Sequence, residues 1–497
     1  MGQRRVVIVG AGLGGLALGA RLARAGCRVT VIEKQAEPGG RLGCLEHGDY
    51  RFDTGATLYL MPEFFEQTFA DLGRRRADYY DLIKVDPNYR LHFADGSTLD
   101  LSTDMAALQA ELERFEPGAM RGALAFLAEG GRCYDAAVRT FLSRNFRGPF
   151  EFFAPKHVPL MFEMRVFQRH YARACRYFRS DKLRQAMTFQ TMYLGASPFE
   201  ALATYLLLQY AELVRGIYLP RGGMYRVTRA LARVLQEEGG ELRCGATATE
   251  IVLQGRRAIG VRLADGAKLE ADAVAANADV PYVYDRLLSH PDAAREAQRL
   301  KRYQYTSSAV MFYWGLDRRY ERELPRHHNI FLSADYRGSF EQIFQQYRAP
   351  ENPSFYISSP VRTDTGYCPA GKEAWVVLVP VGHLVEGVAA DWQQQAAVIR
   401  AHVLRRLAAA GMADVAEHIR FEGCYTPCYW SEALNLAKGS AFSLAHGFTQ
   451  VGYFRPHNRA DRFENLYFVG AGTHPGTGLP LVLASARLTA ERILRGD

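Results

Sequence analysis

The sequence lacks the features that mark exported, membrane-spanning or metal-binding proteins. Its eight cysteines show no paired spacing except Cys424 and Cys428, which have no His or Cys pair nearby, so reduced thiols and no metal site are expected. A β-branched run starts almost at the first residue, which leaves no room for a signal peptide, and Val6 replaces the Ser or Thr of a myristoylation motif. The longest apolar stretch, near residues 201–211, is too short to span a bilayer and predicts a buried or interfacial helix.

The length and composition indicate a globular protein of more than one domain. A chain of 497 residues exceeds a single hydrophobic core, so at least two domains are expected. Hydrophobic residues make up 48% of the chain, far from the composition of a disordered protein. Together with reduced thiols, these values predict a cytoplasmic protein.

The N-terminal residues carry a glycine pattern that binds dinucleotides. A β-branched run over residues 6–9 ends in Gly10-x-Gly12-x-x-Gly15, and a helix rich in Ala and Leu is predicted to about residue 25. Gly10 permits the tight turn, Gly12 lets a pyrophosphate approach the backbone, and Gly15 lets helix and strand pack closely. The pyrophosphate is expected at the N-terminus of the helix, where free N–H groups and the helix dipole favour negative charge.

A second predicted strand, 28–32, delivers Glu33 and Lys34 to the same site. Glu33 is placed to accept hydrogen bonds from a ribose diol and would repel a 2′-phosphate. Gly39-Gly40-Arg41 follows and suits a second close approach to a pyrophosphate. Taken alone, this region predicts a bound dinucleotide and leaves NAD and FAD open.

The C-terminal region repeats the strand, glycine turn and helix. Residues 465–469 form a predicted strand that ends in Gly470-Ala471-Gly472-Thr473, and a helix is predicted over about 480–494. Such a turn would aim helix N–H groups at the pyrophosphate or at a flavin ring from the opposite side. The two ends of the chain are therefore expected to meet at one cofactor.

Positive charge is concentrated in one segment between these ends. Residues 139–184 contain eleven Lys and Arg against three acidic residues, so their net charge of +8 equals that of the whole chain. Ten Phe and Tyr side chains are interleaved with the cations. This combination suits the headgroup region of an anionic membrane, and a helical cap with a solvated arginine face is the alternative. No DNA- or RNA-binding module accompanies the charge, so a nucleic-acid partner is not expected.

The rest of the chain predicts a discontinuous architecture. Residues 104–215 show the three-to-four spacing of helices, and a helix over 225–238 follows. Strands are predicted at 241–244, 250–253, 258–263 and 273–276. Residues 300–445 alternate strands, such as 308–313 and 375–379, with helices such as 391–410.

The distributed motifs resemble the phytoene desaturase family of bacterial and fungal carotenoid desaturases, which are FAD-dependent amine oxidase-like flavoproteins. The resemblance rests on VVIVGAGLGGL with its GGR, on LPRGGMYRVTRAL and AVAANAD, and on NLYFVGAGTHPGTGLP. It implies that the cofactor is FAD. The residues expected to contact it are Gly10, Gly12, Gly15, Glu33, Lys34, Gly40, Arg41, Ala248 through its backbone, Gly472 and Thr473.

The expected fold class is α/β, with three parts. A discontinuous Rossmann-type FAD-binding domain takes residues 1–75, 216–290 and 449–497. A mixed-sheet substrate domain takes 76–103 and 291–448. A helical, membrane-contacting subdomain, 104–215, is expected to admit the substrate.

The resemblance also implies a reaction. A flavin accepts a hydride from a carbon of a long isoprenoid or carotenoid, and the neighbouring carbon loses a proton. The substrate needs an apolar tunnel, which residues 104–215 and 300–445 are expected to line, and access from a membrane surface. The protein is therefore expected at the inner face of the cell membrane. Oxygen or a quinone is the expected electron acceptor. A homo-oligomer is possible, and the sequence does not determine the oligomeric state.

Catalytic candidates are fewer. His474 lies in the C-terminal turn, where proton transfer and bracing of the turn are both open. Arg147 and Arg165 lie in the basic segment, where membrane contact is the alternative role.

Two other functions stay open at this point. A flavin amine oxidase acting on a soluble amine shares the cofactor motifs but does not explain the basic aromatic segment. A non-catalytic escort for prenylated proteins shares the fold, but the intact glycines and Glu33 argue against it. The motifs leave the substrate length, the number of double bonds introduced and any hydroxyl or methoxyl preference undetermined.

Overall fold

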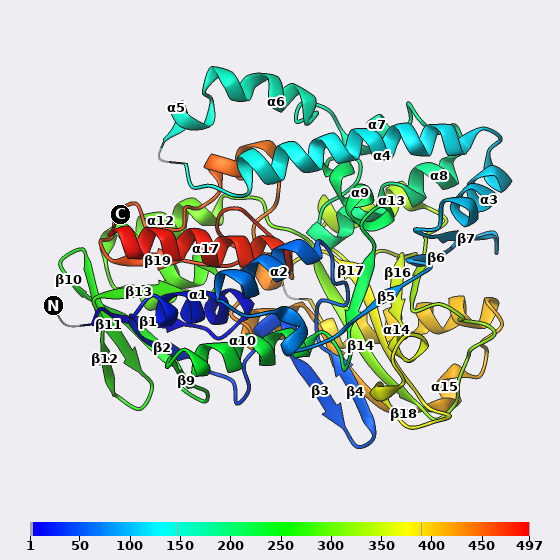
Figure 1. Cartoon of the computed structure of the whole chain (residues 1–497). Coiled ribbons are helices and arrows are strands. Elements are labelled where there is room, and N and C mark those ends of the chain that lie inside the picture. Colours follow the sequence, from blue (N-terminus) through cyan, green and yellow to red (C-terminus); the bar gives the residue numbers. More distant parts are fainter. Residues whose placement is uncertain (1–2, 147, 389, 497) are drawn as a thin grey trace.

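A five-stranded parallel sheet is built from three distant parts of the chain (Figure 1). The structure, a computed structural model, describes residues 3–146, 148–388 and 390–496. In spatial order the strands are β19 (Leu466–Phe468), β13 (Ala273–Ala276), β1 (Arg5–Val9), β2 (Arg28–Ile32) and β9 (Glu241–Arg243). Because parallel strands end at the same edge of a sheet, the glycine turns that follow β1 and β19 open onto one edge.

Strand β1 is buried on both faces, which explains its unbroken apolar run. Val6 and Ile8 share a core with three helices, α1 (Leu13–Arg24), α10 (Tyr225–Glu237) and α17 (Leu479–Arg495). Val7 and Val9 point the other way, into a core shared with an antiparallel sheet. That sheet consists of β10 (Ala248–Gln254), β11 (Arg257–Leu263) and β12 (Lys268–Glu270).

A mixed seven-stranded sheet forms the other half of the molecule. Its order is β18 (Ile419–Tyr425), β14 (Ser308–Leu316), β17 (Glu373–Val381), β16 (Phe355–Ser358), β15 (His328–Phe331), β6 (Tyr89–His92) and β7 (Thr98–Leu101). Alternate residues of β14 face opposite layers, as the two-residue period of a strand requires. Phe312 and Trp314 pack under α14 (Trp392–Ala409), whereas Met311 points to the cavity described below.

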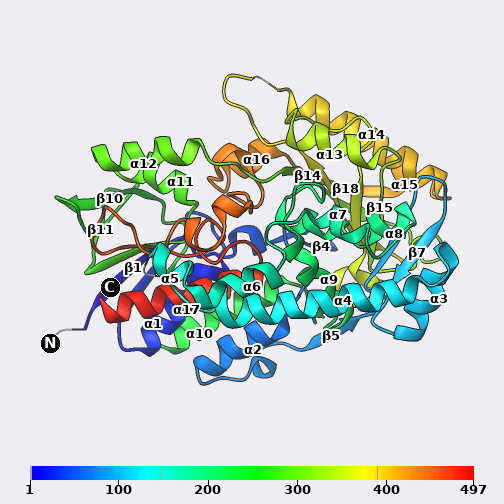
Figure 2. The same ribbon diagram turned by 90° about the horizontal axis from the view of Figure 1, so that it is seen from above.

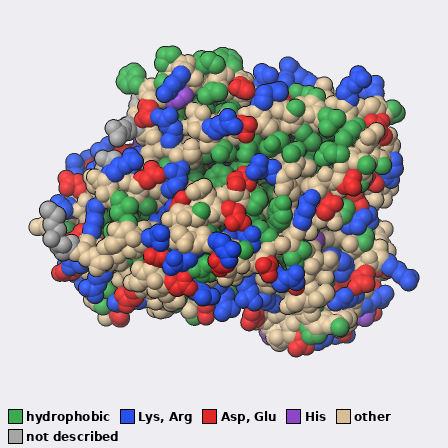
Figure 3. All heavy atoms as spheres, viewed as in Figure 1, with side chains coloured by type: hydrophobic (Ala, Val, Ile, Leu, Met, Phe, Trp, Pro, Cys, Tyr) green, Lys and Arg blue, Asp and Glu red, His purple; other side chains and the backbone are tan. Residues whose placement is uncertain are grey.

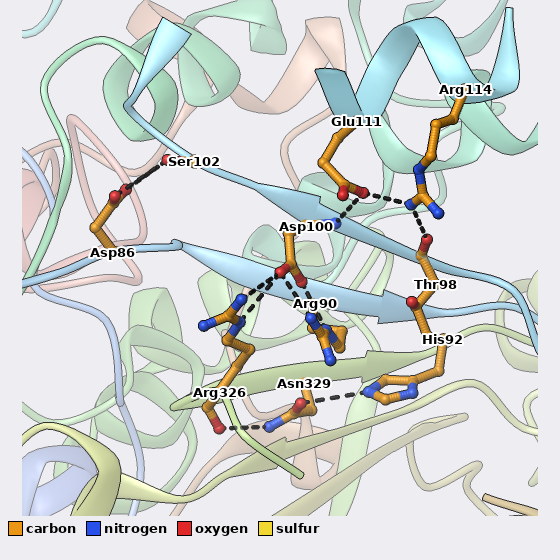
Figure 4. Close-up of polar contacts among 10 residues, drawn as sticks. All are labelled: Asp86, Arg90, His92, Thr98, Asp100, Ser102, Glu111, Arg114, Arg326 and Asn329. Carbon is orange, nitrogen blue, oxygen red and sulfur yellow. Dashed lines mark hydrogen bonds and ion pairs between the residues drawn. The ribbon is translucent and has the colours of Figure 1, made fainter. Parts of the chain in front are cut away.

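A shared carboxylate ties the edge of this sheet together (Figure 4). Asp100 of β7 accepts two hydrogen bonds from Arg90 of β6, at 2.7 and 2.8 Å, and two from Arg326, at 2.8 and 3.1 Å. Beside it, His92 and Asn329 join β6 to β15 at 3.3 Å. These contacts connect residues 89–101 to a segment more than 200 positions later in the sequence, as the parallel β6–β15 pairing requires.

Helices cover one side of both sheets (Figures 1 and 2). They are α3 (Met105–Phe115), α4 (Ala119–Ala136), α5 (Pro149–Phe152), α6 (Val158–Glu163), α7 (His170–Ala174), α8 (Asp181–Ala186) and α9 (Leu206–Leu213). The long helix α4 runs lengthwise over the molecule, and α9 packs against it. Helix α9 is largely buried, which confirms the buried helix predicted near residues 201–211.

The remaining elements connect these layers. Helix α2 (Pro62–Asp71) packs on α17, and α12 (Pro291–Lys301) comes after strand β13 of the five-stranded sheet in the sequence. Helices α13 (Tyr336–Phe344) and α16 (Pro427–Glu432) flank the seven-stranded sheet. Two short antiparallel pairs complete the fold: β3 (Cys44–His47) with β4 (Tyr50–Asp53), and β5 (Leu82–Val85) with β8 (Ile217–Pro220).

The strands and helices expected from the sequence are present where it predicts them, with ends that differ by at most three residues. The mainly helical nature of residues 104–215 is also confirmed, although several of its helices are short. Strand β5 was not anticipated as a partner of β8, because the two lie far apart in the sequence. Within the described ranges, no helix is both long enough and apolar enough to span a bilayer. All eight cysteines are free.

Candidate functional site

One cavity extends between the five-stranded and seven-stranded sheets. Its first end is lined by both glycine turns and by the residues that follow β2. Its second end is lined by side chains from residues 189–193 and from the seven-stranded sheet. Both segments that the sequence predicts to line an apolar tunnel therefore line this cavity.

The turn after β1 leaves helix N–H groups open toward the cavity. Gly10 has a φ of +99°, a conformation that disfavours other residues. A Cβ on Gly15 would lie 2.1 Å from the carbonyl oxygen of Gly10, so Gly15 is required for close packing rather than for lining the cavity. Helix α1 starts at Leu13 without a side-chain cap, and Gly12 and Leu13 line the cavity. These features fit a pyrophosphate.

The carboxylate of Glu33 is held at the cavity wall by two backbone donors. Its Oε2 accepts a hydrogen bond from the Ala11 N–H at 2.8 Å, and its Oε1 accepts one from the Gln35 N–H at 3.0 Å. Each carboxylate oxygen retains further acceptor capacity, as binding of a ribose diol requires. Lys34 also lines the cavity and donates to the Glu432 carbonyl at 3.3 Å, and burial lowers its pKa.

Arg41 lies on the cavity wall with its charge largely removed from water. Its Nη1 donates to the carbonyl of Ala441 at 3.1 Å. Burial lowers the pKa of Arg41, and nearby Asp279 opposes that shift. Gly40 lines the cavity beside it. A cation at this point suits a phosphate oxygen.

Asn277, at the end of β13, links the two glycine turns. Its side-chain amide donates to the Val469 carbonyl at 2.9 Å, just before the C-terminal turn. A Cβ on Gly12 would lie 2.6 Å from its Oδ1. The sequence motif AVAANAD contains this residue, but only the order β19-β13-β1 reveals that it lies between both turns.

The C-terminal turn presents a second helix N-terminus to the cavity. Gly472, Gly478 and Leu479 line it, and α17 begins at Leu479 without a side-chain cap. Thr473 points away from the cavity, because its hydroxyl donates to the Pro456 carbonyl at 2.6 Å. Thr473 thus shapes the turn from behind.

Arg455 braces the same turn as a buried cation. It donates five hydrogen bonds to carbonyl oxygens, including that of Ala471 at 2.6 Å and that of Thr473 at 3.2 Å. Among the described residues no carboxylate lies within ion-pair distance. Burial lowers the pKa of Arg455 to about 10. Sequence reasoning missed this residue, because its partners are backbone groups of separate loops.

The structure brings most of the expected cofactor residues to one wall. Those that line the cavity are Gly10, Gly12, Glu33, Lys34, Gly40, Arg41, Ala248 and Gly472. Gly15 and Thr473 lie behind the wall and support it.

The catalytic candidates lie elsewhere. His474 is buried behind the cavity wall, where its Nε2 is 2.9 Å from the carbonyl oxygen of Arg144, and burial lowers its pKa to about 4. This position favours bracing of the turn over proton transfer. Arg165 pairs with the buried carboxylate of Glu129 at 2.6 Å. Arg147 lies outside the described residues.

The second end of the cavity is apolar and aromatic. Its wall includes Phe189, Met192, Met311, Ile330, Leu332 and Phe340. Among the described residues that line the whole cavity, the carboxylates are Glu33 and Asp279. Asp279 accepts hydrogen bonds from Ser443 at 2.6 Å and from the Ala437 N–H at 3.0 Å, so it serves local structure.

Comparisons with known proteins agree with this geometry. A family model described as flavin containing amine oxidoreductase matches residues 13–494. The chain is 46% identical over 492 residues to the zeta-carotene-forming phytoene desaturase of Myxococcus xanthus, which covers 99% of this chain and 94% of that protein. It is 41% identical over 505 residues to the phytoene desaturase of Neurospora crassa, covering 99% and 84%.

Among solved structures, a putrescine oxidase variant superposes with a TM-score of 0.65 at 15% identity, covering 100% of this chain and 99% of that one. At this identity the likeness establishes the fold, a flavin amine oxidase-like α/β fold with mixed sheets. The two uncapped helix ends, Glu33 and Arg41 fit the phosphates and ribose of FAD. The chain belongs to the phytoene desaturase family of flavin-containing amine oxidoreductases, and it is an FAD-dependent oxidoreductase.

Proposed function

We propose that this protein introduces conjugated double bonds into phytoene or a closely related long isoprenoid, in carotenoid biosynthesis. The observation that carries the proposal is the single cavity, which joins a dinucleotide cradle to an apolar, aromatic wall. A soluble amine, which is cationic at neutral pH, would be favoured by a carboxylate at that second end. Both carboxylates that line the described cavity belong to the cofactor end. The relatives named above are phytoene desaturases.

In this proposal FAD lies along the first end of the cavity. Gly10, Gly12 and the start of α1 hold the pyrophosphate, and Glu33 accepts the ribose hydroxyls. Arg41 and the start of α17 approach from the other side. When bound there, FAD would supply a hydride acceptor for the polyene. The apolar wall would position the chain and exclude water from the charge that develops on it.

We also propose that the protein binds the inner face of the cell membrane through an exposed aromatic surface. This phenylalanine surface comprises Phe150, Phe153, Val158, Phe162 and Phe167, on α5, α6 and the loops that flank them. Phe150 is 92% exposed and Phe162 is 60% exposed. Figure 3 shows hydrophobic side chains gathered there, along the top of the molecule, with Lys and Arg beside them. Such a patch is costly in water and suits the acyl boundary of a bilayer.

The basic segment contributes less free charge than its composition suggests. Arg165 and Arg173 share the buried Glu129, Arg179 pairs with Glu116, and Lys182 pairs with Asp95. These acids lie outside residues 139–184, so the count within the segment does not include them. The apolar surface is therefore expected to dominate membrane binding, with a smaller electrostatic part.

Expression in a host that accumulates phytoene tests the proposed reaction. New pigments with longer conjugation, identified by absorbance and mass, are expected, and addition of oxygen or quinone to membranes would identify the electron acceptor. A host that also makes the shorter analogue would define the substrate length. No new polyene from any precursor would contradict the proposal, and peroxide formed with a soluble amine would replace it with an amine oxidase.

A further inference from the structure

Three hydrogen-bonded side chains form a polar chain on the wall of the otherwise apolar end of the cavity. The hydroxyl oxygens of Thr57 and Tyr356 are 2.8 Å apart, and the Tyr356 hydroxyl is 2.7 Å from Nδ1 of His328. Thr57 and Tyr356 line the cavity, whereas His328 is completely buried behind them. Tyr356 thus connects the cavity to Nδ1 of His328, which the cavity does not reach directly.

This polar chain starts where the cofactor end of the cavity meets its apolar end. Thr57 follows Gly55, which packs directly on the backbone of Arg41: a Cβ on Gly55 would lie 2.0 Å from the Arg41 carbonyl oxygen. Gly55, Thr57 and Arg41 all line the cavity. Tyr356, hydrogen-bonded to Thr57, therefore lines the cavity close to the point where its two ends meet.

His328 is a neutral base in these surroundings. Burial holds its pKa well below the ordinary value, and the neighbouring ring of His327, 4.0 Å away, adds to the shift. No described acidic side chain forms an ion pair with it. Its Nε2 has no hydrogen-bond partner among the described residues, although an unpaired buried nitrogen carries a cost.

We propose that Tyr356 accepts the proton released during desaturation and passes its own proton to His328. This inference rests on the proposed function. One C–H bond of the substrate gives up its hydrogen with both electrons to the flavin. The neighbouring C–H bond gives its hydrogen as a proton to Oη of Tyr356, and its electrons form the new double bond.

The proton of the Tyr356 hydroxyl moves at the same time to Nδ1 of His328. It returns through the same two atoms to water when the product leaves. A carbon beside a delocalised cation is strongly acidic, so a weak, neutral base is sufficient. An apolar wall favours a neutral base over a charged one. Thr57 orients the tyrosine hydroxyl and is a positioning residue.

Replacing Tyr356 with Phe removes the hydroxyl and keeps the ring. The expected result is a fall of about 100-fold in kcat, within the usual range for loss of a general base, with the bound-flavin spectrum and KM unchanged. The deuterium isotope effect at the carbon that loses the proton is expected to rise, because that step becomes limiting. Tyr320→Phe is the matched control: it removes a buried tyrosine hydroxyl from the same half of the molecule, away from the cavity, where the hydroxyl donates to Asp414 at 3.0 Å.

His328→Gln is the second variant, because it offers Tyr356 an acceptor but no base. His328 does not line the cavity, so this variant is expected to bind FAD even if Tyr356→Phe does not. The same loss of kcat and the same raised isotope effect are expected. The proposal is overturned if Tyr356→Phe stays within twofold of the wild type, or if it loses activity only through KM with an unchanged isotope effect. A wild-type protein that desaturates nothing would instead contradict the proposed function itself.

Discussion

At the scale of single residues, the site depends on Glu33 and Arg455, whose hydrogen bonds few other side chains could make. Glu33 combines a charge with two backbone hydrogen bonds, so it is fixed before any ligand arrives. Arg455 places a full charge among carbonyl oxygens behind the C-terminal turn. Both residues hold their surroundings rigid, and preorganisation of this kind lowers the cost of binding.

Replacing Glu33 with Gln is expected to weaken FAD binding at least tenfold. The amide keeps an acceptor for the Ala11 N–H but loses the charge that strengthens hydrogen bonds to the ribose. A hydrogen bond to a charged group contributes about 1.5–3 kcal/mol, against about 1 kcal/mol for a neutral one, and a loss of about 1.4 kcal/mol is tenfold in affinity. Flavin release during dilution, followed by fluorescence, measures the change. Glu417→Gln, an exposed carboxylate on α15 (Val415–His418), is the control. Equal FAD affinity in the two variants would contradict the proposal that Glu33 binds the ribose.

Asp100 is expected to stabilise the edge of the seven-stranded sheet (Figure 4). Burial alone would raise its pKa, but Arg90 and Arg326 outweigh burial and lower the pKa of Asp100. The ionised form is therefore favoured in the folded state, so this contribution is present above the ordinary aspartate pKa and is lost as the pH falls through the lowered value.

Asp100→Asn is expected to reduce the free energy of unfolding by about 2 kcal/mol at neutral pH, because two partly buried arginines lose their partner. Urea denaturation at pH 7 and at pH 3 measures the effect. The difference between variant and wild type should shrink at the lower pH. A variant as stable as the wild type at pH 7 would show that the arginines find other partners.

At the scale of elements, the phenylalanine surface on α5 and α6 is separable from the rest of the fold. Its exposed rings contact one another and the loop at 448–454, as in the 5.5 Å approach of Phe167 to Phe448. The buried aromatic residues of the same segment, Phe141, Phe146 and Phe152, form a small core beneath it. The surface can therefore change without loss of that core.

Replacing Phe150, Phe162 and Phe167 with Ser is expected to reduce binding to anionic vesicles at least tenfold. Each ring contributes about 1.5–3 kcal/mol when it is buried in the bilayer. The stability of the fold is expected to stay unchanged, because these rings are exposed on the protein. Vesicle sedimentation measures binding. Val398→Ser is the control, because Val398 is 64% exposed on α14, in the other half of the molecule. Binding that is unchanged in the triple variant but abolished by salt would assign the interaction to the basic residues alone.

Elements were predictable from the sequence where one local period or one glycine pattern decides the structure. The β-branched run of β1 and the glycines after it determine a strand, a turn and a helix within 20 residues. Asn277, Arg455 and Tyr356 were not predictable as site residues, because each acts through a partner from a distant strand or loop. The pairing of the basic segment with Glu129 and Glu116 was hidden for the same reason.

At the scale of the whole molecule, the fold places the two ends of the chain at the cofactor end of one cavity and the middle of the chain around its apolar end. Residues 5–32, 241–276 and 466–468 supply the strands of one sheet. The seven-stranded sheet and the helical layer close the other end of the cavity. We therefore expect reduction of the flavin and desaturation of a polyene to be a single event in one cavity.

Anaerobic mixing of the FAD-loaded protein with phytoene in lipid vesicles would show whether the two changes are coupled. The absorbance of oxidised flavin is expected to disappear while a more conjugated polyene forms, with one new double bond for each flavin reduced. A flavin that stays oxidised with phytoene and with its shorter analogue, yet is reduced by a soluble amine, would contradict it.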